Sequence, residues 1–188
     1  MLNLMYKDYY SLSKKDKKRV KDLYYSAFPE EERCPFLILL SKVRKNKGEF
    51  FSFYDEEKYV GLIYNIVYKD LVYIYYLAID KESRNKGYGT RVLTDMKEMY
   101  KDKKIILMAE TLDPDASNYA QRKNRNKFYL KNGFVNQGYI IEEFGVAYDM
   151  LGCSSTKVLK AEFKELIRDY FGNWFFNKIY VKNSNIEE

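Results

Sequence analysis

Residues 84–90 read Arg84-Asn85-Lys86-Gly87-Tyr88-Gly89-Thr90. The run before them, residues 71–79, is rich in β-branched and aromatic side chains and predicts a strand. After them, apolar residues recur at the spacing of one buried helix face, namely Val92, Leu93, Met96, Met99 and Tyr100. A helix that begins here offers unpaired N–H groups and partial positive charge to an anion. The stretch therefore predicts a phosphate-binding turn for a nucleotide-type cofactor; a glycine turn with solvated basic residues is the alternative.

A second motif, Phe128-Tyr129-Leu130-Lys131-Asn132-Gly133-Phe134, follows another predicted strand and helix. The glycine stretch is neither the G-x-G-x-x-G of dinucleotide folds nor a P-loop. The order strand, R-x-x-G-x-G, helix, strand, helix, F-Y-x-x-x-G-F resembles the GNAT superfamily of acyl-CoA-dependent N-acetyltransferases, over about residues 71–134.

The resemblance implies acetyl-CoA as co-substrate and no metal. In the family, the arginine and glycine turn holds the CoA pyrophosphate, while backbone groups of the preceding strand contact the pantetheine arm. Carried over to matching positions, the expected cofactor-binding residues are Leu77, Ile79, Arg84, Lys86, Gly87, Tyr88, Gly89 and Thr90. Of these, Tyr88 and Thr90 are expected to contribute backbone N–H groups.

Two residues are predicted to act in catalysis. Tyr129 aligns with the family tyrosine that hydrogen-bonds and protonates the CoA sulfur; simple packing of one tyrosine among 20 is the alternative. Glu110 ends the strand after the glycine-turn helix, predicted to run parallel to its predecessor, where open α/β sheets place their chemistry. We predict it as the base, with an exposed or salt-bridged strand-end carboxylate as the alternative. Glu142 and Glu143 are further carboxylates, on a strand of unknown register.

The match departs from the family at Arg122. Many members carry asparagine seven positions before the tyrosine, so its expected contact with the pantetheine arm does not carry over. Arg122, Lys123 and Arg125 fit either CoA phosphates or a solvated helix face.

Composition excludes several other chemistries. The chain contains no histidine, which rules out Ser-His-Asp triads, Cys-His dyads and H-E-x-x-H zinc helices. Cys34 and Cys153 stand far apart without C-x-x-C, which favours free thiols. The net charge of +6 raises nucleic acid as a rival partner, but acidic residues interrupt most basic clusters. No signal peptide or membrane span is predicted, so we expect a cytoplasmic protein.

The predicted fold class is α+β, a GNAT-like mixed but mostly antiparallel sheet flanked by helices, with a C-terminal helical extension. We expect Ser117 to cap the last helix before the F-Y motif, Gly133 to end it, and Gly48 to end the second helix. The predicted helices span residues 14–28, 36–45 and 117–132, and a further helix is predicted to begin within residues 87–90 and to carry its apolar face as far as Tyr100. The predicted strands span residues 49–54, 59–68, 71–79, 104–110, 137–143 and 145–151.

The predicted domain boundaries are an acetyltransferase domain over residues 1–152 and an extension over 153–188. The extension carries an apolar helical stripe of Leu159, Phe163, Leu166, Ile167, Tyr170, Phe171 and Trp174. Docking on its own sheet is the favoured use of this stripe, followed by a homodimer contact or a lid.

Together the sequence predicts acetyl transfer from acetyl-CoA to a primary amine, on a small molecule or peptide, by direct attack in a ternary complex. A non-catalytic acyl-CoA-binding regulatory module is the alternative. A basic nucleic-acid-binding protein is the third and less favoured interpretation.

Overall fold

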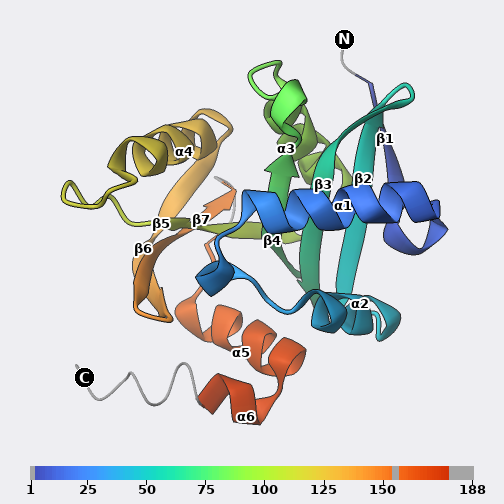
Figure 1. The fold of residues 1–188 in the computed structure, drawn as a ribbon. Helices are drawn as coiled ribbons and strands as arrows, with labels where there is room; N and C mark the ends of the chain where they lie inside the picture. Colours follow the sequence, from blue (N-terminus) through green and yellow to red (C-terminus); the bar gives the residue numbers. More distant parts are fainter. Residues whose placement is uncertain (1–2, 154–156, 178–188) are drawn as a thin grey trace. The chain divides into compact units, whose positions relative to one another are not determined.

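The computed structural model describes residues 3–153 and 157–177. These residues form two compact units. The first contains the described residues up to Val67 together with Ile74–Lys101, and the second contains Tyr68–Tyr73 and the described residues from Asp102 onward. Each unit is built from strands with helices packed against them (Figure 1).

The first unit has the strand order β1-β2-β3-β4. The pairs β1–β2 and β2–β3 are antiparallel. Its strands are β1 (Leu4–Asp8), β2 (Gly48–Asp55), β3 (Lys58–Tyr68) and β4 (Leu71–Ile79). The last residue of β3 and the first three residues of β4 belong to the second unit. The longer helices of the first unit are α1 (Lys14–Ala27), α2 (Phe36–Arg44) and α3 (Tyr88–Met99).

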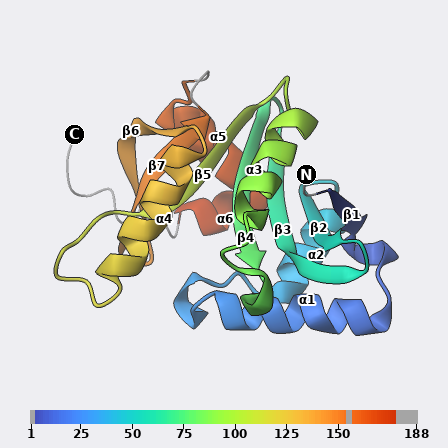
Figure 2. The same cartoon turned by 90° about the horizontal axis from the view of Figure 1, so that it is seen from above.

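Helices cover both faces of these strands, with α1 and α2 on one face and α3 on the other (Figures 1 and 2). Toward α2, Phe50 and Tyr64 are fully buried, and the Tyr64 hydroxyl donates to the carbonyl of Leu39. Toward α3, Asn65 donates to the Sδ of Met96, and Tyr6 donates to Asp95 at 2.8 Å. Because successive side chains along β2 and β3 point to opposite faces, these strands pack against helices on both sides.

Gly61 in β3 fixes how closely β3 and β4 approach. A Cβ added there would lie 2.2 Å from the carbonyl oxygen of Ala78, so only glycine fits. This contact holds the C-terminal part of β4, which leads into the glycine turn. Asp80 follows at once, and its N–H donates to the carbonyl of Val60 at 2.8 Å.

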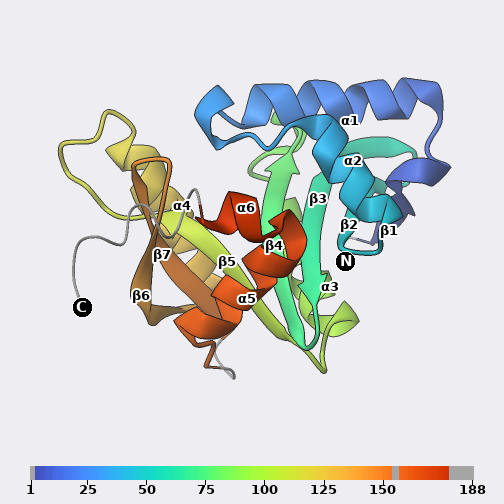
Figure 3. The ribbon, with the colours of Figure 1, turned by 90° about the horizontal axis from the view of Figure 1, so that it is seen from below.

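The second unit has the strand order β5-β7-β6, and both pairs are antiparallel. Figures 2 and 3 show α4 and α5 on opposite faces of these strands. Its strands are β5 (Lys104–Glu110), β6 (Phe134–Glu143) and β7 (Val146–Cys153), and its helices are α4 (Tyr119–Lys131), α5 (Lys160–Phe171) and α6 (Asn173–Phe176).

The C-terminal extension packs within the second unit. Four residues of the predicted stripe are at most 1% exposed, namely Phe163, Leu166, Ile167 and Tyr170. The rings of Phe163 and Tyr73 pack edge to face, with their centroids 5.5 Å apart. The Nζ of Lys104 forms an ion pair with the Oε1 of Glu162 at 2.5 Å. Docking of this helix on its own chain, the use of the stripe that the sequence favoured, explains the burial of these four residues. The homodimer contact and the boundary at residue 152 stay predictions, and residues 154–156 and 178–188 of the extension lie outside the described residues.

The fold class is confirmed, with corrections to two helix ends and one missed strand. Asn118, not Ser117, is the N-cap residue of α4. Gly48 does not end α2; it opens β2, and Lys45 is the C-cap residue. Gly133 follows the α4 C-cap with φ 76°, as predicted. β1 was missed because its five residues carry a short and half-exposed pattern.

Candidate active site

The turn between β4 and α3 adopts a conformation that depends on glycine. Gly87 is the N-cap residue of α3 with φ 83°, in the left-handed region where residues with a Cβ are strained. Asn85 shares that region, with φ 61°. Gly89 lies within the helix and outside the left-handed region, so its backbone conformation does not require glycine. Among the residues described, no side chain caps the α3 N-terminus.

The side chains of the turn separate into two sets. The Tyr88 side chain turns inward, is 6% exposed and donates to Asp55 at 2.5 Å. This hydrogen bond to the Asp55 carboxylate raises the Tyr88 pKa. Arg84 and Lys86 are exposed; the Arg84 Nε donates to the carbonyl of Ile79 at 3.1 Å, and the Lys86 Nζ to that of Glu82 at 2.8 Å. The two cations are thereby held beside the helix N-terminus.

These features fit a diphosphate group. The first N–H groups of a helix have no intrahelical acceptor, and α3 has no capping side chain to satisfy them. The helix dipole adds partial positive charge, and two cations flank the turn. Leu77 and Ile79 lie half-buried on one side of β4, two residues apart, immediately upstream. All eight residues expected to bind the cofactor therefore lie together in the first unit.

The second unit holds a buried ion-pair network around Glu110, which is 4% exposed. Its Oε1 lies 3.0 Å from the Nη2 of Arg122 and accepts from the Nδ2 of Asn118 at 3.1 Å. Its Oε2 accepts from the Nη1 of Arg125 at 2.9 Å. Both carboxylate oxygens of the predicted base therefore already accept from donors on α4 or its N-cap.

Arg122 joins three parts of the network. Besides Glu110, its Nε donates to the Oδ1 of Asn118 at 2.6 Å, and its Nη1 donates to the carbonyl of Thr111 at 3.1 Å. The sequence left Arg122 and Arg125 between CoA phosphates and a solvated face, and missed this pairing. The spacing of 118, 122 and 125, i, i+4 and i+7 on one helix face, is the signal that could have found it.

Tyr129 lies one helical turn beyond Arg125 on α4, half-buried. The centroid of its ring lies 5.4 Å from that of the Phe128 ring and 6.1 Å from that of the Phe134 ring. Burial raises the Tyr129 pKa, an effect that the nearby Arg125 cation partly opposes. The phenol therefore carries its proton at neutral pH, as a hydrogen-bond donor to a leaving group must.

A second carboxyl group lies on the same face of the strands as Glu110. The register pairs Glu110 with Tyr148 and Tyr148 with Ile141, and Glu143 is two residues beyond Ile141. Glu143 is half-buried, and burial raises its pKa to about 7. A carboxyl group with a pKa near the working pH is well matched to general base catalysis.

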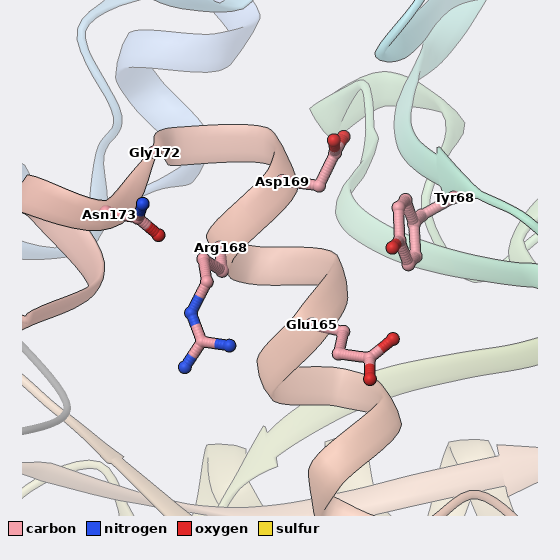
Figure 4. Close-up of a pocket in the computed structure, with 6 residues that line it drawn as sticks. All are labelled: Tyr68, Glu165, Arg168, Asp169, Gly172 and Asn173. Carbon is pink, nitrogen blue, oxygen red and sulfur yellow. The ribbon is translucent and has the colours of Figure 1, made fainter.

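A surface hollow also lies in the second unit, on the side of α5. Figure 4 shows Glu165 and Asp169 extending from α5 on the side where the Tyr68 ring lies, and the Arg168 guanidinium on the other side. Lys69 pairs with Glu165 at 3.2 Å. None of the predicted site residues lines this hollow, whose lining is Tyr68, Glu165, Arg168, Asp169, Gly172 and Asn173.

Two further findings concern the described part of the chain. No helix in it has the length and apolar character needed to cross a membrane. Nor does it hold a group of three or more acidic, cysteine or histidine side chains arranged for a metal ion.

Comparison with known proteins finds a family match over the part of the chain that carries the glycine turn and α4. Residues 46–136 match the family model of the acetyltransferase (GNAT) domain. That segment includes the glycine turn, Glu110, and the whole of α4 with Tyr129. Among curated proteins, no sequence matches this chain.

Several solved structures share the fold. A proposed GNAT-family acetyltransferase from Bacteroides thetaiotaomicron is 22% identical with a TM-score of 0.69, over 90% of this chain and 99% of that one. An aminoglycoside 6'-N-acetyltransferase complexed with coenzyme A is 16% identical with a TM-score of 0.62, over 79% and 95%. Spermidine N-acetyltransferase from Vibrio cholerae, with CoA and spermine, is 14% identical with a TM-score of 0.60, over 85% and 97%. The family model thus assigns residues 46–136 to an acetyltransferase (GNAT) domain, and the solved structures show that the chain shares the fold of these acetyltransferases.

Proposed function

We propose that this protein transfers an acetyl group from acetyl-CoA to a primary amine by direct attack, without a covalent enzyme intermediate. The observation that carries the proposal is the uncapped N-terminus of α3 behind the left-handed Gly87, with Arg84 and Lys86 beside it. The backbone N–H groups of Tyr88, Gly89 and Thr90 would hold the pyrophosphate. Backbone groups of Leu77 and Ile79 would hold the pantetheine arm, and no metal is needed.

The thioester supplies an electrophilic carbonyl and a thiolate leaving group with a pKa of about 8.5. The amine nitrogen forms a bond to the carbonyl carbon, and the carbon–sulfur bond breaks. Tyr129 would donate its hydroxyl hydrogen bond to the departing sulfur. Because a phenol has an ordinary pKa of about 10 and burial raises that of Tyr129, its main contribution is stabilisation of the developing thiolate.

The acceptor must also lose a proton. An alkyl amine with a pKa of about 10.4 is neutral in only about one molecule in a thousand at pH 7. We propose that a carboxylate of the second unit takes this proton, directly or through water. Glu110 is the candidate from the sequence, and Glu143 is the other carboxyl group on that strand face.

Glu110→Gln separates the roles open to Glu110. A base would give the largest loss of kcat/KM at neutral pH and the smallest at alkaline pH, where more of the amine is already deprotonated. A carboxylate that only attracts a cationic acceptor would chiefly raise KM. An unchanged pH–rate profile would remove Glu110 as the base, and Glu143→Gln is the matched test of the other carboxyl group.

Small amines are the acceptor class to test first, since two structural neighbours are named for spermidine and an aminoglycoside. The experiment is an assay of acetyl-CoA turnover against polyamines, aminoglycosides, amino acids, peptide N-termini and lysine side chains, with free thiol as readout. We expect amine-dependent thiol release for at least one class. CoA binding without thiol release for any of them would favour the regulatory module.

A further inference from the structure

The network around Glu110 joins the end of β5 to α4 at several points. Asn118 and Arg122 reach Glu110 Oε1, and Arg125 reaches Oε2. A further hydrogen bond from Arg122 reaches the carbonyl of Thr111, the first residue after β5. The pairing covers the first two turns of a helix whose own residues include none that is fully buried. Polar contacts therefore hold α4 in place, whereas most helices are held by burial of an apolar face.

Tyr129 continues the same helix face. Positions 118, 122, 125 and 129 are spaced four, three and four residues apart, which keeps their side chains in one stripe at 3.6 residues per turn. Tyr129 lies about 6 Å along the axis from Arg125, at 1.5 Å per residue. A rotation or shift of α4 at Arg125 therefore moves the Tyr129 hydroxyl by a similar amount.

We infer that Glu110, Arg122 and Arg125 are positioning residues that hold α4, and with it the Tyr129 hydroxyl, at the place where the leaving sulfur must be met. The inference rests on the proposed function for the role of Tyr129. We call Glu110, Arg122 and Arg125 together the clamp. Because Arg122 stands where many members of the family are expected to carry asparagine, the clamp is a property of this sequence rather than of the family motif. It gives Glu110 a task that needs no proton transfer.

Charge makes Glu110 the central member of the clamp. Glu110→Gln leaves two guanidinium groups facing each other without a carboxylate between them. By contrast, Arg125→Met leaves Glu110 with Arg122 and Asn118. Arg125 is the more exposed of the two arginines, at 41% against 16%, so Arg125→Met is the milder variant and should fold if Glu110→Gln does not.

The test compares Glu110→Gln, Arg122→Met and Arg125→Met with Lys127→Met, which removes an exposed cation of the same helix. We expect kcat to fall about ten- to a hundredfold in Glu110→Gln, less in each arginine variant, and not in Lys127→Met. CoA affinity should stay within about twofold of the wild type in all four. In the Tyr129→Phe background the same changes should add little, because they act through that hydroxyl.

A second readout needs no activity. Without CoA, backbone amides of residues 119–131 should exchange hydrogen faster in the clamp variants than in the wild type or Lys127→Met. Exchange and kcat equal to those of Lys127→Met would overturn the inference, as would a Glu110→Gln loss that adds fully to Tyr129→Phe and disappears at alkaline pH. A wild type that releases no thiol with any amine would instead refute the proposed function, and hydrogen exchange would still decide the clamp.

Discussion

The glycine turn of the first unit and the α4 face of the second unit are built on opposite principles. At the turn, the groups proposed to bind a ligand are backbone N–H groups, and the Tyr88 side chain points away to Asp55. On α4, the proposed acting group is the Tyr129 side chain, and two arginines of the same helix form ion pairs with one buried carboxylate, Glu110. The turn should therefore tolerate most side-chain changes except at its glycines, whereas α4 should be sensitive to single side-chain changes.

Loss of CoA binding on substitution of a turn glycine is the largest effect we expect. Gly89→Val adds a branched side chain where the proposal places the diphosphate, and because Gly89 is not left-handed the variant should still fold. CoA affinity should fall by at least about a hundredfold, since several hydrogen bonds to a charged group, worth about 1.5–3 kcal/mol each, are blocked. Calorimetry measures this directly.

Gly87→Val should weaken CoA as strongly, but it also strains the backbone. Gly138 has nearly the same φ, 82° against 83°, with nothing within 4 Å of an added Cβ, so Gly138→Val is the matched control for strain alone. Unchanged CoA affinity in a folded Gly89→Val protein would remove the cofactor from this turn.

Tyr129→Phe tests the side-chain half of the comparison. The ring and its contacts with Phe128 and Phe134 remain, so CoA affinity should persist while kcat falls about ten- to a thousandfold. Steady-state kinetics with saturating amine gives the ratio. Tyr119→Phe, at the start of the same helix, should keep wild-type rates. Wild-type turnover in Tyr129→Phe would reject the assignment.

A smaller effect is expected on stability from Glu143. Burial raises its pKa from 4.5 to about 7, so the folded state holds this proton through a pH window in which the unfolded chain has lost it. The free energy of unfolding should therefore fall as pH rises between about 4.5 and 7, by about 2 kcal/mol after allowance for partial exposure.

Glu143→Gln should remove that fall and leave the protein more stable than the wild type at about pH 8, with little difference at about pH 4. Urea unfolding at both pH values is the measurement. An equal difference at the two pH values would show that the carboxyl group does not titrate in this window.

The smallest effect concerns Arg84. The contribution proposed for it in CoA binding is that of a partly solvated charge, so Arg84→Ala should weaken CoA about three- to tenfold at low salt and less at high salt. Lys81→Ala, an exposed cation of the preceding turn, serves as the control. A loss independent of salt would instead assign Arg84 a structural role, through its hydrogen bond to Ile79.

Local patterns accounted for much of this fold. β4 and β5 begin and end where the sequence predicts, because long apolar runs with polar ends specify them. The turn was predictable for the same reason, since two glycines and a helix start are adjacent in sequence. The contacts of Glu110 were not, because its partners lie 8 to 15 residues away and depend on how α4 packs on β5.

The helix start at residue 118 shows a related limit. Serine and asparagine have about equal N-cap propensity, so the local sequence does not choose between Ser117 and Asn118. Asn118 is the N-cap residue, and its side chain bonds Glu110 and Arg122 rather than the helix N–H groups, a tertiary contact that no local pattern predicts. The raised pKa of Glu143 was equally hidden, since it depends on the register of β6 and on burial.

The central claim is that the backbone turn binds the acetyl donor and the Tyr129 side chain assists the transfer. The most direct measurement follows free thiol and acetylated amine together in one reaction, with wild type, Gly89→Val and Tyr129→Phe in parallel. We predict equal amounts of both products with the wild type, neither with Gly89→Val, and slow but equal formation with Tyr129→Phe at unchanged CoA affinity. Thiol release by the wild type without acetylated amine, or full activity in Gly89→Val, would contradict the account.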